Sequence, residues 1–126
     1  MNKRYVAVDL DETLAEYDGW KGLDYIGKPK KFSEIGMKLL KDTGFDIIIY
    51  TCRSDEGLDK VKQWLEKHDI PYDYINENPE QPETCSDKKV FAHYYIDDRN
   101  ACFDSLRTSI YKISRKELNR KITDWS

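Results

Sequence analysis

The segment Arg4-Tyr5-Val6-Ala7-Val8-Asp9-Leu10-Asp11-Glu12-Thr13-Leu14 decides the fold. Its first part is rich in β-forming residues and carries no charge after Arg4, which predicts a short buried strand over residues 4–8. Apolar residues on both faces of a strand are typical of a parallel sheet that is covered on both sides. The acidic residues that follow at once should therefore lie at the carboxyl end of this strand.

Outward from this segment, apolar runs alternate with helix-like spacings along the chain. Further strands are predicted over 45–50, 72–75, 92–96 and 109–113, and helices over 32–43, 58–65 and, from a capping box at Ser114, 114–125. Two stretches, 15–31 and 76–88, are predicted to be long loops. This alternation predicts an α/β fold, a Rossmann-like three-layer sandwich with a mostly parallel central sheet, in a single domain over residues 1–126.

The composition argues against several classes of protein. The chain carries 21 Lys and Arg against 24 Asp and Glu, and this balance is not that of a nucleic-acid coat or an anionic-membrane binder. The longest apolar run, 47–50, is too short to span a membrane, and no signal-peptide hydrophobic region follows Met1. The three cysteines form no C-x-x-C pair, which favours free, mostly buried thiols in a reducing compartment. We therefore expect a cytoplasmic protein.

Polar residues follow three of the predicted strands. The strand ends carry Asp9-Leu10-Asp11, Thr51-Cys52-Arg53 and Asp97-Asp98-Arg99. Because the carboxyl ends of parallel strands share one edge of the sheet, these groups should converge there. Four carboxylates in a small volume repel one another unless a cation lies among them. Oxygen ligands beside a hydroxyl and basic side chains indicate Mg²⁺ and a phosphoryl group.

Each of these groups also has a plainer interpretation. Acidic pairs after strands are often helix caps, an Asp-Asp-Arg sequence is commonly a turn, and Thr51 could cap the next helix. Their joint placement, each directly after an apolar strand, is what favours a functional site.

In these residues the sequence resembles the haloacid-dehalogenase-like superfamily. The segment 9–14 is similar to its D-x-D-x-T-[LV] motif, and Thr51 to the hydroxyl residue of its second motif. The motif-three lysine matches Lys89, whose interval to the acidic pair fits better than that of Lys88. The fourth motif matches Asp97 and Asp98, and Glu12 stands where many members have glycine.

The resemblance implies a Mg²⁺-dependent phosphatase that works through an aspartyl-phosphate. Asp9 would be the nucleophile, and Asp11 would serve as general acid and then as general base. Thr51 and Lys89 would complete the catalytic set by holding the phosphoryl group. The Mg²⁺ ligands would be the carboxylates of Asp9, Asp97 and Asp98 with the backbone carbonyl of Asp11. The acidic residue at position 11 is that of the phosphatases rather than the dehalogenases.

The intervals between the motifs indicate how open the site is. Each interval, from Asp11 to Thr51 and from Thr51 to Lys89, holds one predicted helix and one predicted strand, so no room remains for the cap domain of larger members. Small capless relatives include polynucleotide 3′-phosphatases. We therefore expect a phosphorylated small molecule or a nucleotide as substrate, with nucleic acid only as a substrate, and no membrane partner. Candidate substrate-binding residues are Arg53, Arg99 and Trp20.

Two other functions stay open at this stage. A phosphotransferase would pass the phosphoryl group to an acceptor other than water, and a regulatory or binding module would keep the fold without turnover. Every motif residue is present, which favours an enzyme.

Overall fold

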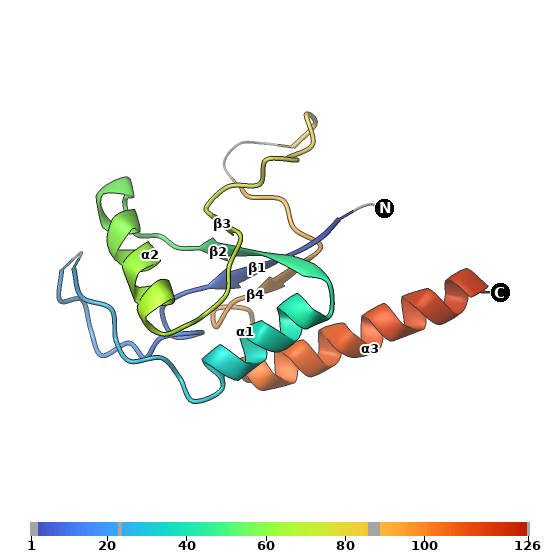
Figure 1. The fold of residues 1–126 in the computed structure, drawn as a ribbon, viewed down its shortest axis with the longest axis horizontal. Helices are drawn as coiled ribbons and strands as arrows, with labels where there is room; N and C mark the ends of the chain where they lie inside the picture. Colours follow the sequence, from blue (N-terminus) through green and yellow to red (C-terminus); the bar gives the residue numbers. More distant parts are fainter. Residues whose placement is uncertain (1–2, 23, 86–88, 126) are drawn as a thin grey trace.

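The computed structural model describes residues 3–22, 24–85 and 89–125 (Figure 1). Within these ranges the four strands, all parallel, form one sheet in the order β3-β2-β1-β4. The strands are β1 (Arg4–Asp9), β2 (Phe45–Tyr50), β3 (Tyr74–Ile75) and β4 (Tyr94–Ile96). The helices are α1 (Ser33–Asp42), α2 (Leu58–Lys67) and α3 (Leu106–Trp125), with a short 3-10 turn, η1 (Asp55–Gly57), before α2. This arrangement confirms the predicted α/β, Rossmann-like fold.

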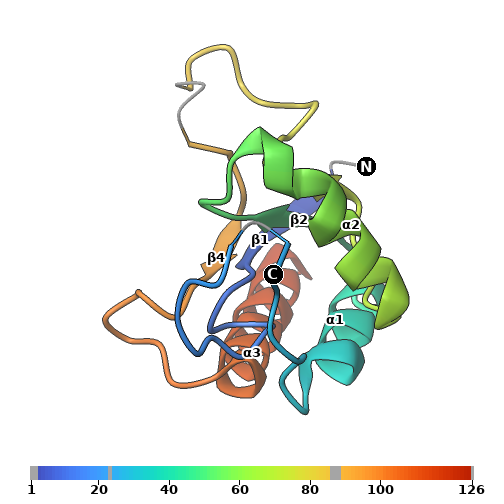
Figure 2. The same ribbon diagram turned by 90° about the vertical axis from the view of Figure 1, so that its left-hand side faces the viewer.

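Two apolar clusters lie on opposite faces of the sheet. On one face, alternate residues of β1 and β2 meet side chains from all three helices; the cluster includes Val6, Val8, Ile47, Ile49, Met37, Leu40, Val61, Leu65, Ile110 and Ile113. On the other face, Tyr5, Ala7 and Ile48 pack against Val90 and Ala92 of the segment after β3. Figure 2 shows this segment above the sheet, opposite α1 and α3. The three layers are therefore helices, sheet and loop.

The start of α3 corrects the sequence prediction. The strand predicted over 109–113 and the helix start predicted at Ser114 are both wrong, because a single helix runs from Leu106 to Trp125. The Ser105 hydroxyl accepts a 3.0 Å hydrogen bond from the Thr108 backbone N–H at its beginning. Ile110 and Ile113 are buried against the first cluster. This tertiary packing overrides the local β-preference of their branched side chains.

Two expectations about burial are also wrong. Cys52 and Cys102 are exposed rather than buried, because both lie in loops beyond the carboxyl ends of strands. Leu118 and Ile122 are exposed as well, although their i, i+4 spacing in the sequence predicts the apolar face of the last helix. The reason is visible in Figure 1, where the second half of α3 extends past the sheet.

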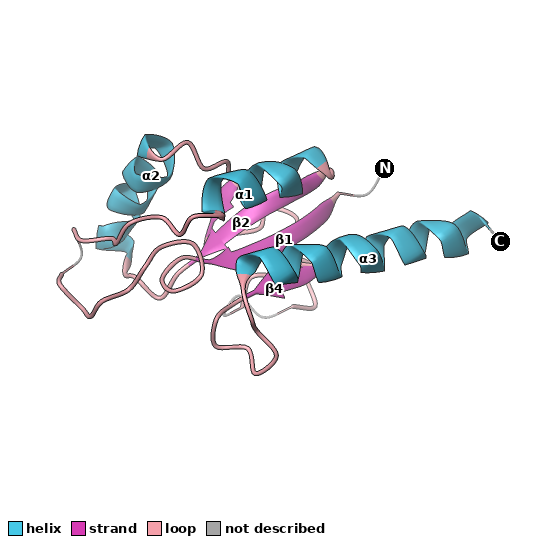
Figure 3. Ribbon diagram, turned by 90° about the horizontal axis from the view of Figure 1, so that it is seen from below, coloured by secondary structure: helices cyan, strands magenta, loops and turns pink. Residues whose placement is uncertain are grey.

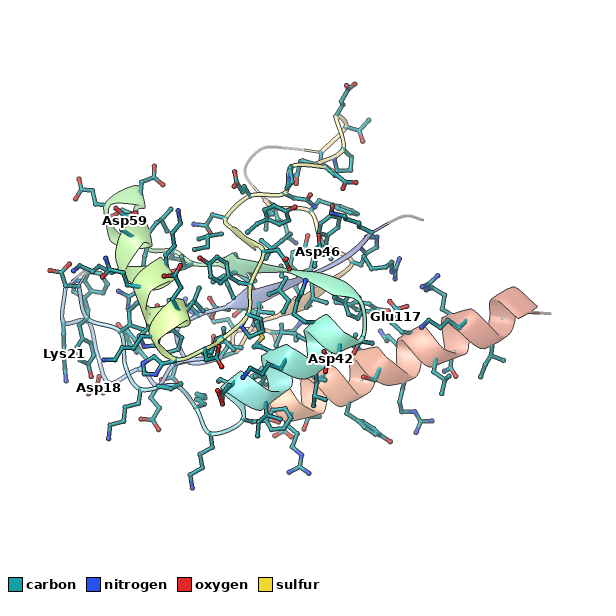
Figure 4. The ribbon with its side chains drawn as sticks, in the orientation of Figure 1. Asp18, Lys21, Asp42, Asp46, Asp59 and Glu117 are labelled. Carbon is teal, nitrogen blue, oxygen red and sulfur yellow. The ribbon has the colours of Figure 1, made fainter. Side chains whose placement is uncertain are left out.

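An ion pair ties α3 to the first strand. The Glu117 carboxylate, almost fully buried, accepts 2.9 Å hydrogen bonds from Arg4 and Arg120. Although burial acts in the opposite direction, these two guanidinium groups lower the pKa of Glu117. Figure 4 shows Glu117 where the strands begin, with Asp18 and Lys21 of loop 15–31 at the other end of the molecule. No helix in the described ranges combines the length and apolar character needed to cross a membrane.

The loop 15–31 is anchored at its base and open at its tip. The Trp64 indole N–H donates to the Gly27 carbonyl over 2.9 Å, and the Glu16 N–H donates to the Lys28 carbonyl over 2.7 Å. Gly27 lies so close to the Glu16 carbonyl that a Cβ there would overlap it. The base of the loop is thus fixed on α2, while Trp20 near the tip is exposed.

Replacing Gly27 tests this contact. Gly27→Ala should lower the free energy of unfolding by about 3 kcal/mol, because the new methyl group must push the two backbone segments apart. Urea unfolding measures the change. Trp64→Phe is the comparison, since it removes the hydrogen bond to the same carbonyl and should cost about 1 kcal/mol. Wild-type stability of Gly27→Ala would contradict the close approach.

Candidate active site

The register of the sheet sets three polar side chains side by side at its carboxyl edge. Asp9 of β1 pairs with Tyr50 of β2, and Val8 pairs with Ile96, so Asp97 follows at the level of Asp9. Because successive strand residues alternate between faces, Asp9, Tyr50 and Asp97 share the face covered by the loop. The strand order reverses between β1 and β4. Open α/β sheets bind their ligands at such a reversal.

Three carboxylates gather at this point. Asp9, Asp97 and Asp98 each offer one oxygen within 4.8 Å of the others. The Tyr50 hydroxyl reaches across β1 and donates a 2.7 Å hydrogen bond to Asp97. The buried Thr13 hydroxyl accepts a 3.1 Å hydrogen bond from the Asp98 backbone N–H. These two hydrogen bonds hold Asp97 and Asp98 against the end of β1.

The close approach of these carboxylates shifts the pKa values of Asp9 and Asp97. Burial, a hydrogen bond with Asp98 and the charges of Asp97 and Asp98 raise the pKa of Asp9 well above its usual range. Burial acts in the same direction on Asp97, but the Tyr50 hydroxyl and the Arg99 backbone N–H outweigh it and lower that pKa. A divalent cation would take the place of the Asp9 proton and stabilise all three charges. An all-oxygen carboxylate set suits a hard cation such as Mg²⁺.

The Asp11 carboxylate is held by a guanidinium group. Arg53 binds it through two contacts, Nη2 to Oδ1 at 3.0 Å and Nε to Oδ2 at 3.2 Å. The Trp20 ring covers the same guanidinium group, whose carbon lies 5.5 Å from the ring centroid. Arg53 is only 8% exposed, so this pair is partly withdrawn from water and geometrically well defined.

These residues line one hollow at the carboxyl edge. It has a volume of about 450 Å³, and its walls include Asp9, Asp11, Trp20, Arg53, Asp98 and Arg99. The structure therefore brings all three predicted substrate-binding residues to the predicted carboxylates.

Thr51 and Lys89 line an adjoining hollow of about 610 Å³, which shares Tyr50, Asp97 and Arg99 with the first. The Thr51 N–H donates to the Asn76 side chain over 2.9 Å, and its hydroxyl accepts from the Arg53 N–H over 3.1 Å. The Lys89 ammonium group packs on the Tyr95 ring, 4.6 Å from its centroid. Lys88, the alternative to Lys89, lies outside the described residues.

Three supporting residues were not predicted from the sequence, namely Thr13, Tyr50 and Asn76. The alternation of β2 contained a signal for Tyr50, because its predicted face is the one that Asp9 occupies. The hydrogen bonds of Thr13 and Asn76 join loops distant in the chain and had no such local signal.

Comparisons with known proteins extend the fold assignment. No protein-family model matches the chain, and no curated protein matches it significantly. A conserved protein from Bacteroides thetaiotaomicron has a similar structure, with 27% identity, a TM-score of 0.75 and coverage of 91% of this chain and 93% of that chain. A chain in the Pnkp1/Rnl/Hen1 RNA repair complex is 20% identical, with a TM-score of 0.58 over 87% of this chain and 39% of that chain. The similarity to the chain of the RNA repair complex, at 20% identity, shows that the two chains share a fold.

Cation binding at the three carboxylates can be tested without any substrate. Mg²⁺ should raise the melting temperature of the protein, because it binds the three carboxylates only in the folded state. It also offsets the repulsion between Asp9 and the charges of Asp97 and Asp98. Differential scanning calorimetry with increasing Mg²⁺ measures the shift. Asp98→Asn should remove most of it, whereas Asp59→Asn, an exposed change on α2, should keep it. Equal shifts in both variants would place the cation elsewhere.

Proposed function

We propose that this chain is a Mg²⁺-dependent phosphomonoester hydrolase of the haloacid-dehalogenase-like superfamily. The observation that carries the proposal is the meeting of Asp9, Asp97 and Asp98, beside Asp11, where the strand order reverses. The order of the sequence motifs supports it independently. Mg²⁺, when bound by the three carboxylates, would supply charge neutralisation at the phosphoryl oxygens.

In the proposed mechanism, the two carboxylates of the first motif act in turn. An oxygen of Asp9 forms a bond to phosphorus while the bond from phosphorus to the leaving oxygen breaks. Asp11 enters this step as a protonated carboxyl group and gives its proton to that oxygen, so the leaving group departs as an alcohol. Asp11 then takes a proton from water, whose oxygen attacks phosphorus and releases phosphate from Asp9. Both side chains end the cycle in their starting state.

The surrounding residues orient this chemistry. The two contacts from Arg53 fix the direction of the Asp11 carboxylate, and the Tyr50 hydroxyl does the same for Asp97. The Thr51 hydroxyl donates to a phosphoryl oxygen, and Lys89 brings positive charge to the adjoining hollow.

The substrate we propose is a nucleotide or the phosphorylated end of a polynucleotide. Trp20 is 60% exposed and stands on Arg53 at the wall of the carboxylate hollow, so a base beside a bound phosphate would meet its ring. The fold likeness to a chain of an RNA repair complex agrees with this class of substrate without deciding it.

Removal of the nucleophile tests the reaction. Asp9→Asn should reduce hydrolysis of p-nitrophenyl phosphate in Mg²⁺ by roughly a thousandfold or more, because an amide is a poor nucleophile. Steady-state release of nitrophenol and of phosphate measures it, and equal amounts of the two products distinguish hydrolysis from transfer. The variant should melt no lower than the wild type without Mg²⁺, since it relieves the charge crowding at Asp9. Near-normal turnover would contradict the covalent mechanism.

Truncation of Trp20 tests the substrate class. Trp20→Ala should lower kcat/KM for a nucleoside monophosphate about tenfold more than for p-nitrophenyl phosphate, because only the nucleotide has a base to stack on the ring. Tyr25→Ala is the matched control, since Tyr25 belongs to the same loop but lines a different hollow. Equal losses on both substrates, with a lower melting temperature, would show that Trp20 only anchors the loop.

A further inference from the structure

The charge of the chain is unevenly distributed, and α3 is its most cationic helix. Although the whole chain has a net charge of −3, α3 contains six Lys and Arg against two acidic residues, Glu117 and Asp124. Glu117 is buried and paired with Arg4 and Arg120, so it does not offset the exposed cations of the helix. Lys112, Arg115 and Lys116 are exposed near the middle of α3.

These three cations line a groove beside the outer strand of the sheet. The groove has a volume of about 410 Å³, lies between β4 and α3, and has Tyr95, Asn100, Tyr111, Lys112, Arg115 and Lys116 in its walls. β4 is the last strand in the sheet order, so this side of the sheet is open within the described residues. Figure 3 shows α3 running beside β4, from the carboxyl edge of the sheet back past the strand starts.

The groove continues into the candidate active site. It shares Tyr95, Asp97 and Asn100 with the hollow of Thr51 and Lys89, and that hollow in turn adjoins the carboxylates. A chain-like ligand with its end at Asp9 could therefore pass Lys89, turn around β4 and lie along residues 109–116 of α3.

We infer that this surface, the α3 groove, binds the single strand of a polynucleotide whose terminal phosphate occupies the carboxylate site. The inference rests on the proposed function. Lys112, Arg115 and Lys116 match the backbone phosphates of such a strand. Tyr111, which is 59% exposed and accepts a 3.1 Å hydrogen bond from Arg115, offers an aromatic ring on which an unpaired base can stack. An acidic peptide would pair with the same cations, but it carries no terminal phosphate. The continuity of the groove with the carboxylate site would then have no role.

The test measures binding in the absence of catalysis. A short fluorescent single-stranded RNA ending in a hydroxyl is titrated with the full chain in EDTA, and fluorescence anisotropy is recorded at several salt concentrations. Lys112→Ala/Lys116→Ala should weaken binding about tenfold at low salt and reduce the salt slope by about 0.7 for each lost phosphate contact. Arg107→Ala/Lys121→Ala removes the same charge from α3 outside the groove and should bind as the wild type does. Tyr111→Ala should also weaken binding, and Leu118→Ala should not.

The outcomes separate this inference from the proposed function. Hydrolysis of p-nitrophenyl phosphate by the wild type tests the proposed function. RNA binding in EDTA tests separately whether the α3 groove binds a polynucleotide. Absence of RNA binding by the wild type, or equal losses in the two double variants, would overturn the inference. Equally tight binding of a polyglutamate of the same length, lost in the same variants, would overturn it in favour of an acidic peptide.

Discussion

The site depends on one unfavourable arrangement, the placement of three carboxylates where β1 and β4 end side by side. Asp9, Asp97 and Asp98 lie close enough to share a cation, and their repulsion with burial raises the pKa of Asp9. The neighbouring hydrogen bonds hold this arrangement in place. Tyr50 and Thr13 each fix one member of the acidic pair, and Arg53 holds the Asp11 carboxylate beside them through an ion pair. Such an arrangement is unfavourable without a cation and would be stabilised by a bound divalent cation.

The parallel sheet makes this arrangement possible because it fixes both the direction of the strands and the register of their carboxyl ends. β1 lies between β2 and β4, and its register brings Asp9 opposite Tyr50 and just past the Val8–Ile96 pair. The buried residues of β1 and β2 prevent a shift by one position, which would turn Val6, Val8, Ile47 and Ile49 to the wrong face. Packing on both faces of the sheet therefore determines where the polar side chains meet.

Two loop segments border the carboxylate site and so limit which ligands can enter it. Loop 15–31 is fixed at Gly27 by Trp64 and Glu16, and near its tip Trp20 covers Arg53. On the other side, Lys89 and Tyr95 border the hollow that leads to the α3 groove. The proposed substrate would lie between these two surfaces. The chain of the RNA repair complex shares the fold over 39% of its own length, whereas the Bacteroides thetaiotaomicron protein shares it over 93%.

By itself the sequence determined the parallel α/β fold, the strands β1 and β2 to within a residue, and the sheet edge at which the acidic and hydroxyl residues gather. These features depend on local patterns, namely apolar runs, their length and the polar residues that end them. Only the tertiary structure decided the start of α3, because packing of Ile110 and Ile113 on the core outweighed their local preference for strands. It also decided the contact of Tyr50 with Asp97, 47 positions apart, and the pairing of Asp11 with Arg53, 42 positions apart. Such contacts depend on strand order and register, which bring distant residues together and leave no periodic trace in the chain.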